Sequence, residues 1–332
     1  MCLALGVAVG ISSCGDSGSL GSSSAQNESE TDVESAQIVV ESSENEEHSV
    51  DGKDESTTTL SDEFTAELLA EHPFDCLNQE LDVFVNVFGI YVISHSSIPR
   101  KYIEHSANVV AEFMDNDYDG VVDDPEVHRF LVDNNFVVPV WTEELRDRVF
   151  PSLRGSFCED NLGWAASMYF GEDRWAFGGV RQAGSWDTNL EEIWHVLSMG
   201  WYHTYPEYFG DEPGSRLADA MDSARGGQFQ TVPESYPESA WYRYDDDSCD
   251  YFCQIHEYFY WILMANIDAL SPEYTTKCAD SEDEWFLCTR AELQQVDLLA
   301  YDLLNNQGFN LPTNIPSGDY QRRVTGAQVN RS

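Results

Sequence analysis

The chain has 332 residues, of which 42% are hydrophobic and 13% aromatic, so it is long enough to bury a substantial core. Its 60 acidic side chains outnumber 17 basic ones, which gives a formal net charge of -43. This balance excludes nucleic acid as a partner and excludes electrostatic binding to anionic membranes, because both need clustered Lys and Arg. It favours divalent cations.

The N-terminal stretch MCLALGVAVGISSC is an apolar run that ends in small residues and a cysteine. We expect residues 1–14 to be an export signal, because the run is too short to span a bilayer as a helix. Its end, Ile11 to Cys14, resembles a bacterial lipobox, which implies a lipid anchor at Cys14 as the membrane attachment. The expected location is the cell surface, the periplasm or the medium. No Lys or Arg precedes the run, and a frayed apolar terminus is the alternative.

Residues 15–62 are rich in Ser, Gly, Glu, Asp and Thr and poor in apolar groups. Such a segment cannot bury enough surface to fold, which predicts a disordered acidic tether. The pattern is globular afterwards. Residues 63–322 are predicted to form a single α+β domain, mainly helical with a small sheet, followed by a tail over 323–332.

Within this domain the hydrophobic pattern predicts elements in the following order. A buried strand is expected over 81–94, where a helix is the alternative. The remaining predictions are helices over 99–114, 125–132 and 141–150, strands or a hairpin over 167–180, and helices over 189–202, 215–225, 249–269 and 292–305. The paired glycines at 226 and 227 end the helix before them.

Between the second and third of these elements lies DNDYDGVVDDPE, residues 115–126. Oxygen ligands at loop positions 1, 3, 5, 7, 9 and 12 wrap a calcium ion, and a glycine at position 6 allows the sharp turn. Gly120 stands at the turn, and the ligand positions hold Asp115, Asp117, Asp119, the carbonyl of Val121, Asp123 and Glu126. The stretch resembles an EF-hand loop, with flanking helices over about 100–135. This resemblance implies Ca²⁺ binding, and an acidic surface turn is the alternative.

No second loop with this spacing occurs in the sequence. A single hand outside the cell meets roughly millimolar calcium and stays filled, so the loop is predicted to be a structural clip. A calcium sensor is the weaker alternative, and it requires a conformational change at micromolar calcium.

A second group of metal-ligand residues lies in TNLEEIWHVLSMGWYH, which ends at His203. On a helix, Glu191 and Glu192 both approach His195, because residues three and four apart share a face. Further along, His256 and Glu257 occur in a strongly apolar helix. A carboxylate there is costly unless it is paired or bound to a metal.

This constellation resembles the zincin metallopeptidases, in which an HExxH helix binds zinc and a later helix supplies a third ligand. The resemblance implies Zn²⁺ held by Glu191, His195 and Glu257, with Glu192 as the catalytic base. The segment from Arg174 to Gly178 would match the strand that lines a zincin cleft. The pattern departs from the family at Glu191, where the family has a histidine.

Other interpretations of this helix remain open. Thr188 and Glu191 fit a capping box, which would make His195 a core histidine paired with Glu192 or Glu257. His203 is either a further ligand or a cation at the helix end. A di-iron bundle needs a second ExxH motif, and the sequence has none.

Six cysteines remain after Cys2 and Cys14 are assigned to the signal: Cys76, Cys158, Cys249, Cys253, Cys278 and Cys288. An even number in an exported chain predicts disulfides, with fifteen pairings open. Cys278 and Cys288 could close a short loop. A zinc site is the rival, but the sequence has no CxxC pair.

Two functions follow from these patterns. The first is an exported calcium-binding protein with a zincin-like fold, either a metallopeptidase or an inactive relative. The alternative is a non-enzymatic cell-surface binding or adhesion module in which calcium is a structural clip. Both imply a protein or peptide ligand of unknown identity.

Overall fold

The strands of this protein form one mixed sheet. The computed structural model describes residues 74–77, 80–305 and 308–321. Within these ranges the sheet has four strands in chain order: β1 (Val83–Val87), β2 (Ile90–Ser94), β3 (Val137–Trp141) and β4 (Met168–Tyr169). β1 is antiparallel to β2, and β3 is parallel to both β2 and β4. The predicted α+β class with a small sheet is confirmed.

The stretch predicted as one strand over 81–94 is a β-hairpin, so that prediction was wrong. Phe88 and Gly89 both have positive φ angles, 53° and 93°, as a two-residue hairpin turn requires. The Gly89 N–H donates a hydrogen bond of 2.7 Å to the Asn86 side chain, which closes the turn. A glycine inside an apolar run was the available signal for this break.

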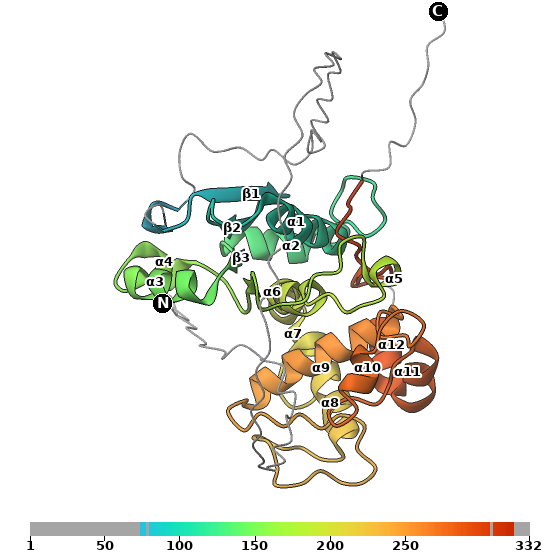
Figure 1. Ribbon diagram of the computed structural model, residues 1–332. Coiled ribbons are helices and arrows are strands. Elements are labelled where there is room, and N and C mark those ends of the chain that lie inside the picture. The colour runs from blue at the N-terminus through green and yellow to red at the C-terminus, as the bar shows by residue number, and fades with distance from the viewer. Residues whose placement is uncertain (1–73, 78–79, 306–307, 322–332) are drawn as a thin grey trace, which may run out of the picture. The chain divides into compact units, whose positions relative to one another are not determined.

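Helix α6 connects the two sides of the helical part of the domain. In chain order the helices are α1 (Arg100–Met114), α2 (Pro125–Asp133), α3 (Glu143–Leu153), α4 (Phe157–Asn161), α5 (Val180–Ala183), α6 (Asn189–Thr204), α7 (Pro206–Phe209), α8 (Arg216–Arg225), α9 (Tyr251–Asn266), α10 (Lys277–Asp280), α11 (Arg290–Val296) and α12 (Leu298–Leu304), after a 3-10 turn over Asp75–Leu77. Figure 1 shows α6 between the sheet with α1 and α2 and the C-terminal helices. It contacts α1, α2 and α9 directly.

Two predicted elements have different boundaries in the structure. Trp141 ends β3, and α3 begins only after Thr142, whose side chain accepts a hydrogen bond from the Leu145 N–H as an N-cap. Over 167–180 only two residues pair as a strand. Gly178 and Gly179 then adopt positive φ angles, 82° and 83°, and turn the chain into α5.

The helix predicted over 292–305 is divided into α11 and α12 by Asp297, whose φ of -110° and ψ of 70° lie outside the helical range. The buried carboxylate of Asp297 caps α12 through the Ala300 N–H at 3.1 Å. It also accepts hydrogen bonds from Tyr258 at 2.6 Å and Trp241 at 2.8 Å. These contacts with distant aromatic residues hold the break in place.

The long helix α9 forms the centre of the larger core. Tyr258, Phe259, Tyr260 and Trp261 are each at most 1% exposed, although they are consecutive and point to all sides. A helix that is apolar all round is buried by its neighbours. The prediction of a central buried helix in this region is confirmed, with the shorter bounds given above.

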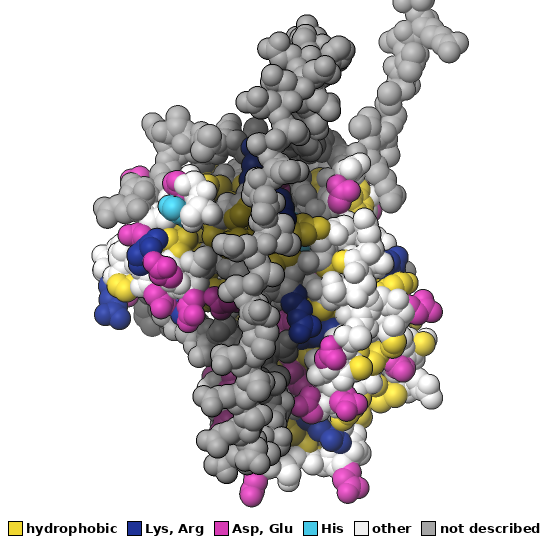
Figure 2. Space-filling view, in the orientation of Figure 1, with side chains coloured by type: hydrophobic (Ala, Val, Ile, Leu, Met, Phe, Trp, Pro, Cys, Tyr) yellow, Lys and Arg dark blue, Asp and Glu magenta, His cyan; other side chains and the backbone are white. Residues whose placement is uncertain are grey.

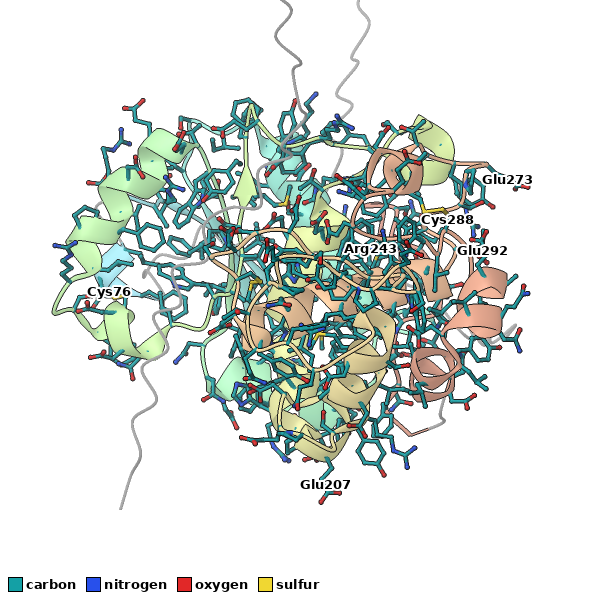
Figure 3. The ribbon with its side chains drawn as sticks, turned by 90° about the horizontal axis from the view of Figure 1, so that it is seen from below. Cys76, Glu207, Arg243, Glu273, Cys288 and Glu292 are labelled. Atoms are coloured by element: carbon teal, nitrogen blue, oxygen red, sulfur yellow. A yellow bond between two sulfur atoms is a disulfide. The ribbon has the colours of Figure 1, made fainter. Side chains whose placement is uncertain are left out.

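Three disulfides join the six cysteines of the domain, as predicted: Cys76–Cys158, Cys249–Cys253 and Cys278–Cys288. The first joins residues 82 apart in sequence and ties the 3-10 turn to α4, beside a second, smaller core around Trp141. Figure 3 shows Cys76 near α3 and α4 and Cys288 among the C-terminal helices. The disulfides therefore constrain different regions of the domain.

The described residues all belong to one compact unit. Within these ranges, no helix is long and apolar enough to cross a membrane. Acidic side chains are spread over the face drawn in Figure 2, among fewer basic ones. The predicted signal, the lipid site at Cys14, the tether and the C-terminal tail lie outside the described residues.

Candidate metal sites

The residues predicted to bind zinc come together between α6 and α9. Glu191 and His195 lie one turn apart on α6, and Glu257 belongs to α9. One ligand atom from each lies within 4.8 Å of the other two. Nε2 of His195 is 3.3 Å from Oε2 of Glu257. Residues far apart in sequence thus form one cluster, which we call the Glu–His cluster (Glu191, His195 and Glu257).

The chemistry of the Glu–His cluster fits a divalent transition metal. His195 is only 8% exposed, and its Nε2 has no hydrogen-bond partner of good geometry among the described residues. Buried ring nitrogens are normally satisfied, so an unsatisfied one aimed at a carboxylate is unusual. An imidazole nitrogen with two carboxylates is a donor set that zinc accepts.

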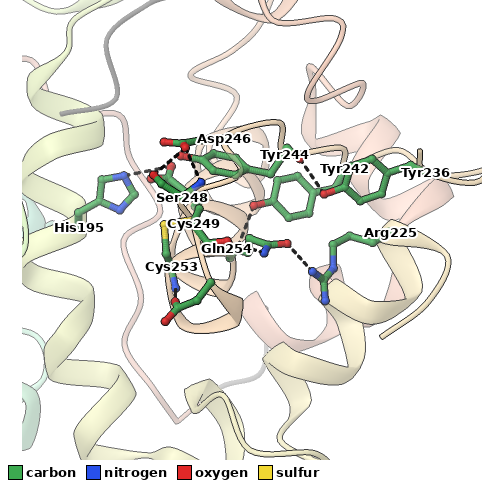
Figure 4. Close-up of a disulfide and its surroundings, with 12 residues drawn as sticks. His195, Arg225, Tyr236, Tyr242, Tyr244, Asp246, Ser248, Cys249, Cys253 and Gln254 are labelled. Carbon is green, nitrogen blue, oxygen red and sulfur yellow. Dashed lines mark hydrogen bonds and ion pairs between the residues drawn. A yellow bond between two sulfur atoms is a disulfide. The ribbon is translucent and has the colours of Figure 1, made fainter. Parts of the chain in front are cut away.

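Figure 4 shows His195 on α6 near the start of α9, where a disulfide joins Cys249, just before the helix, to Cys253 in its first turn. Asp250 caps this turn by accepting a hydrogen bond of 3.0 Å from the Cys253 N–H. The disulfide and the cap fix the start of α9, one turn before Glu257. A disulfide and a capping hydrogen bond thus lie in the turn that precedes Glu257.

The Glu–His cluster has strongly perturbed acid–base properties. Burial, reinforced by the charges of Glu191, Asp173 and Glu257, raises the pKa of Glu192 to about 8, although His195 opposes the shift. Burial alone would lower the pKa of His195, but the negative charge of Glu257, whose Oε2 lies 3.3 Å from Nε2, raises it to about 9. Such perturbation by burial and neighbouring charges is typical of functional sites.

Sequence reasoning missed two charged groups beside the cluster. Lys277 on α10 lies with Nζ 3.5 Å from Oε2 of Glu191. Glu284, whose Oε1 accepts a 2.6 Å hydrogen bond from Trp261, has its pKa raised to about 8 by burial and then by Glu257. The sequence signal for these two residues was the short loop closed by Cys278 and Cys288. Lys277 directly precedes this loop, and Glu284 lies within it.

The predicted capping box at the start of α6 does not form. Thr188 makes no side-chain cap, and its Oγ1 accepts a hydrogen bond of 3.2 Å from the Arg174 N–H instead. Glu191 faces Lys277. The Arg174 carbonyl also accepts a hydrogen bond of 3.0 Å from the Thr188 N–H, so the segment from Arg174 to Gly178 is bonded at its first residue to the N-cap of α6.

The two other histidines on these helices, His203 and His256, lie outside the Glu–His cluster. His203 stacks on Phe130 with ring centroids 4.7 Å apart, and it is not part of the Glu–His cluster. Burial lowers its pKa, which disfavours the cationic role at the helix end. His256 is buried between Phe252 and Tyr202, and burial lowers its pKa to about 3. It is a neutral core residue.

A buried histidine–aspartate hydrogen bond that the sequence did not indicate supports the start of α6. Nε2 of His105 on α1 is 2.6 Å from Oδ2 of Asp187, and both side chains are at most 2% exposed. The other oxygen of Asp187 accepts a 2.8 Å hydrogen bond from the Asn189 side chain, which in turn accepts from Ser106 at 2.6 Å. This network fixes α6 against α1 just before Glu191.

The acidic loop joins α1 to α2, as the helix–loop–helix pattern predicted. Asp115, Asp117 and Asp123 each bring one carboxylate oxygen within 4.8 Å of the others. Gly120 has a φ of 85°, and its N–H donates a 2.7 Å hydrogen bond to Asp115. Burial, together with the neighbouring carboxylates, raises the pKa of Asp123 to about 6, although a hydrogen bond from Asn116 opposes the shift.

The remaining predicted calcium ligands, Asp119, Val121 and Glu126, are not part of the group formed by the other three. Asp119 accepts a 2.8 Å hydrogen bond from the Val121 N–H, and the Val121 side chain is 60% exposed. Glu126 lies in the first turn of α2 and pairs with Arg129, and its side chain is half exposed. Its carboxylate is outside the group formed by Asp115, Asp117 and Asp123.

The acidic loop also holds the C-terminal strap, which we define as residues 308–321. The Asn116 side chain accepts hydrogen bonds from the backbone N–H groups of Thr313 at 2.7 Å and Asn314 at 2.9 Å. The Tyr320 hydroxyl donates to the carboxylate of Asp115. The buried Glu112 of α1 accepts two further backbone N–H groups of the strap, at 2.6 and 2.8 Å. One of the predicted calcium ligands, Asp115, therefore contacts the strap directly.

Comparison of the chain with family models, with curated proteins and with solved structures finds no match. The resemblances to EF-hand loops and to zincins therefore rest on the residues of this chain alone.

Proposed function

We propose that this protein is a zinc-dependent hydrolase of the zincin type, acting on peptide bonds and stabilised by calcium. One observation carries the proposal: the residues that correspond to the three zincin ligands, Glu191, His195 and Glu257, converge within 4.8 Å although they come from two helices. The buried Nε2 of His195, which makes no hydrogen bond of good geometry among the described residues, supports it.

In this proposal the Glu–His cluster holds the zinc ion, which supplies Lewis acidity toward a carbonyl oxygen. Glu192 lies on α6 between the two ligands from that helix. It accepts a proton from the attacking water and returns it to the leaving amine. Burial raises the pKa of this carboxylate, which makes it a stronger base for this transfer. The cluster is largely buried, which keeps bulk water away from the carboxylates.

We further propose that the acidic loop binds calcium and acts as a clip for the C-terminal strap. Asp115, Asp117 and Asp123 are already gathered, and Asp119 and the Val121 carbonyl complete the loop positions. Glu126 would leave Arg129 to provide the last, bidentate ligand. The three disulfides support export into an oxidising compartment, where calcium is abundant. A lipid on Cys14 would then anchor the protein to a membrane.

The test measures bound metals by elemental mass spectrometry on the full chain, beside the variants His195→Ala/Glu257→Ala and His95→Ala. We expect about one zinc per chain in the wild type and in His95→Ala, whose histidine lies outside both sites, and none in the double variant. Calcium should remain in all three. Glu192→Gln should keep zinc and lose hydrolysis of fluorescein-labelled casein, and retained hydrolysis would refute its role as base.

A non-enzymatic surface module is the second candidate. It is favoured by the contacts that Glu191 makes with Lys277 and that Glu257 makes with His195, because they partly satisfy these groups without a metal. Under this alternative the same experiment yields calcium alone.

A further inference from the structure

Lys277 is a cation that contacts the Glu–His cluster. Its ammonium lies 3.5 Å from Glu191, and its side chain is 15% exposed. It also lies over the indole rings of Trp186 and Trp261, at 5.9 and 5.4 Å from the ring centroids. Ammonium groups are attracted to indole faces, so the rings help to keep the charge at this position.

The backbone around Lys277 is constrained. Lys277 begins α10, and the adjacent Cys278 is joined to Cys288. The Lys277 N–H also donates a 3.1 Å hydrogen bond to the Thr275 side chain. A lysine is usually a mobile surface residue, and here both its ammonium and its backbone are held. This arrangement calls for an explanation beyond solubility.

The charge of the proposed zinc centre explains why an ammonium is held at this position. A zinc ion held by two histidines and one glutamate keeps one net positive charge, because neutral imidazoles add none. Glu191 in place of a histidine would bring the sum of ion and ligands to zero. A less positive centre polarises a carbonyl oxygen less strongly. The ammonium of Lys277 lies against the carboxylate that removes the charge.

We infer that Lys277 is a positioning residue that offsets the negative charge of Glu191, so that a centre with two glutamates and one histidine retains hydrolytic power. This inference rests on the proposed zinc-dependent function. It explains how the departure from the HExxH pattern is compatible with activity.

If Lys277 has this role, its removal should raise zinc affinity and lower turnover. Removing the ammonium ends its repulsion of a bound cation and frees Glu191, so zinc should bind more tightly. The same change leaves the centre less electrophilic, so turnover should fall. A residue that only supports the fold or orients Glu191 would lower zinc affinity and turnover together.

The experiment compares Lys277→Met with Lys277→Arg and with Arg243→Met, which removes an equal charge at a residue stacked on Phe286. Zinc dissociation constants of the full, disulfide-bonded chain are measured by chelator competition, and kcat and KM on a quenched fluorescent peptide library. We expect Lys277→Met to tighten zinc binding about tenfold and to lower kcat about tenfold with little change in KM. Lys277→Arg should show a smaller loss of kcat, and Arg243→Met should match the wild type in zinc affinity and in kcat.

The same Lys277 substitution is also tested in a protein that carries Glu191→His. Glu191→His recreates the His-Glu-x-x-His pattern and removes the charge that Lys277 offsets. In this background Lys277→Met should change kcat by less than about twofold, because the pair no longer exists. An equal loss of kcat in both backgrounds would overturn the inference.

The outcomes separate the two proposals. Zinc binding and hydrolysis in the wild type, with Lys277→Met altering neither or weakening both, refute the role of Lys277 and leave the proposed function intact. A wild type without zinc refutes the proposed function, and the inference falls with it. Circular dichroism of Lys277→Met excludes loss of the fold as the cause of a change.

Discussion

Replacing Tyr320 with Phe removes one hydroxyl from the contact between the C-terminal strap and the acidic loop. Tyr320 is 5% exposed and Asp115 is fully buried, so water cannot replace the lost donor. The Asp115 carboxylate would keep two backbone donors, from Asp119 at 3.0 Å and Gly120 at 2.7 Å. A hydrogen bond to a buried charged group contributes about 1.5–3 kcal/mol.

This loss should lower the free energy of unfolding of the calcium-free protein by about 1.5–3 kcal/mol, and its Tm by about 3–12 °C. With calcium the loss should be smaller, because the ion then neutralises Asp115. The assay is urea unfolding with and without calcium, together with hydrogen exchange of the strap. Faster exchange should be confined largely to residues 308–321 and the acidic loop.

Tyr301→Phe is the matched control, because the Tyr301 ring stacks under Arg290 and its hydroxyl makes no hydrogen bond that the structure records among the described residues. It should change stability by less than about 0.5 kcal/mol. Equal stability of Tyr320→Phe and the wild type without calcium, or exchange that is unchanged in the strap, would refute the coupling between loop and strap.

Three further predictions concern pH, covalent structure and calcium. The folded-state pKa values of His195, about 9, and Glu192, about 8, both exceed their usual values of 6.5 and 4.5, so the metal-free fold loses stability as pH rises from about 4.5 to 9. Urea midpoints should fall over this range, and Glu192→Gln should flatten the profile; a rising midpoint would contradict these pKa shifts. Serine at both Cys76 and Cys158 should cost about 4.5 kcal/mol, since the disulfide closes a loop of 82 residues, as urea unfolding can measure. Glu126→Gln should weaken calcium binding at least tenfold in calorimetric titration, because it removes the bidentate ligand; unchanged affinity would exclude Glu126 from the site.

Local patterns predicted most helices and the candidate residues. The spacing within 115–126 placed Asp115 and Asp117 near Asp123, and the glycine position matched the observed positive φ of Gly120. Helical periodicity placed Glu191 and His195 on one face of α6. These features depend on residues close together in sequence, so the sequence alone expresses them.

Predictions failed where a distant contact competed with the local pattern. Thr188 could have capped α6, but its side chain accepts a hydrogen bond from Arg174 instead. The periodic pattern over 292–305 continues through Asp297, but the hydrogen bonds from Tyr258 and Trp241 hold that residue outside the helical conformation. Propensity differences of a few tenths of a kcal/mol per residue cannot outweigh such buried contacts.

The sequence by itself determined which residue types are available to bind metals and where along the helices they stand. Only the tertiary structure decided that Glu257 meets His195, that Lys277 meets Glu191, and that the C-terminal strap closes on the acidic loop. The physical reason is that helix periodicity is set by backbone geometry within a few residues. Contacts between helices depend instead on how the whole core packs, and no short stretch of sequence contains that information.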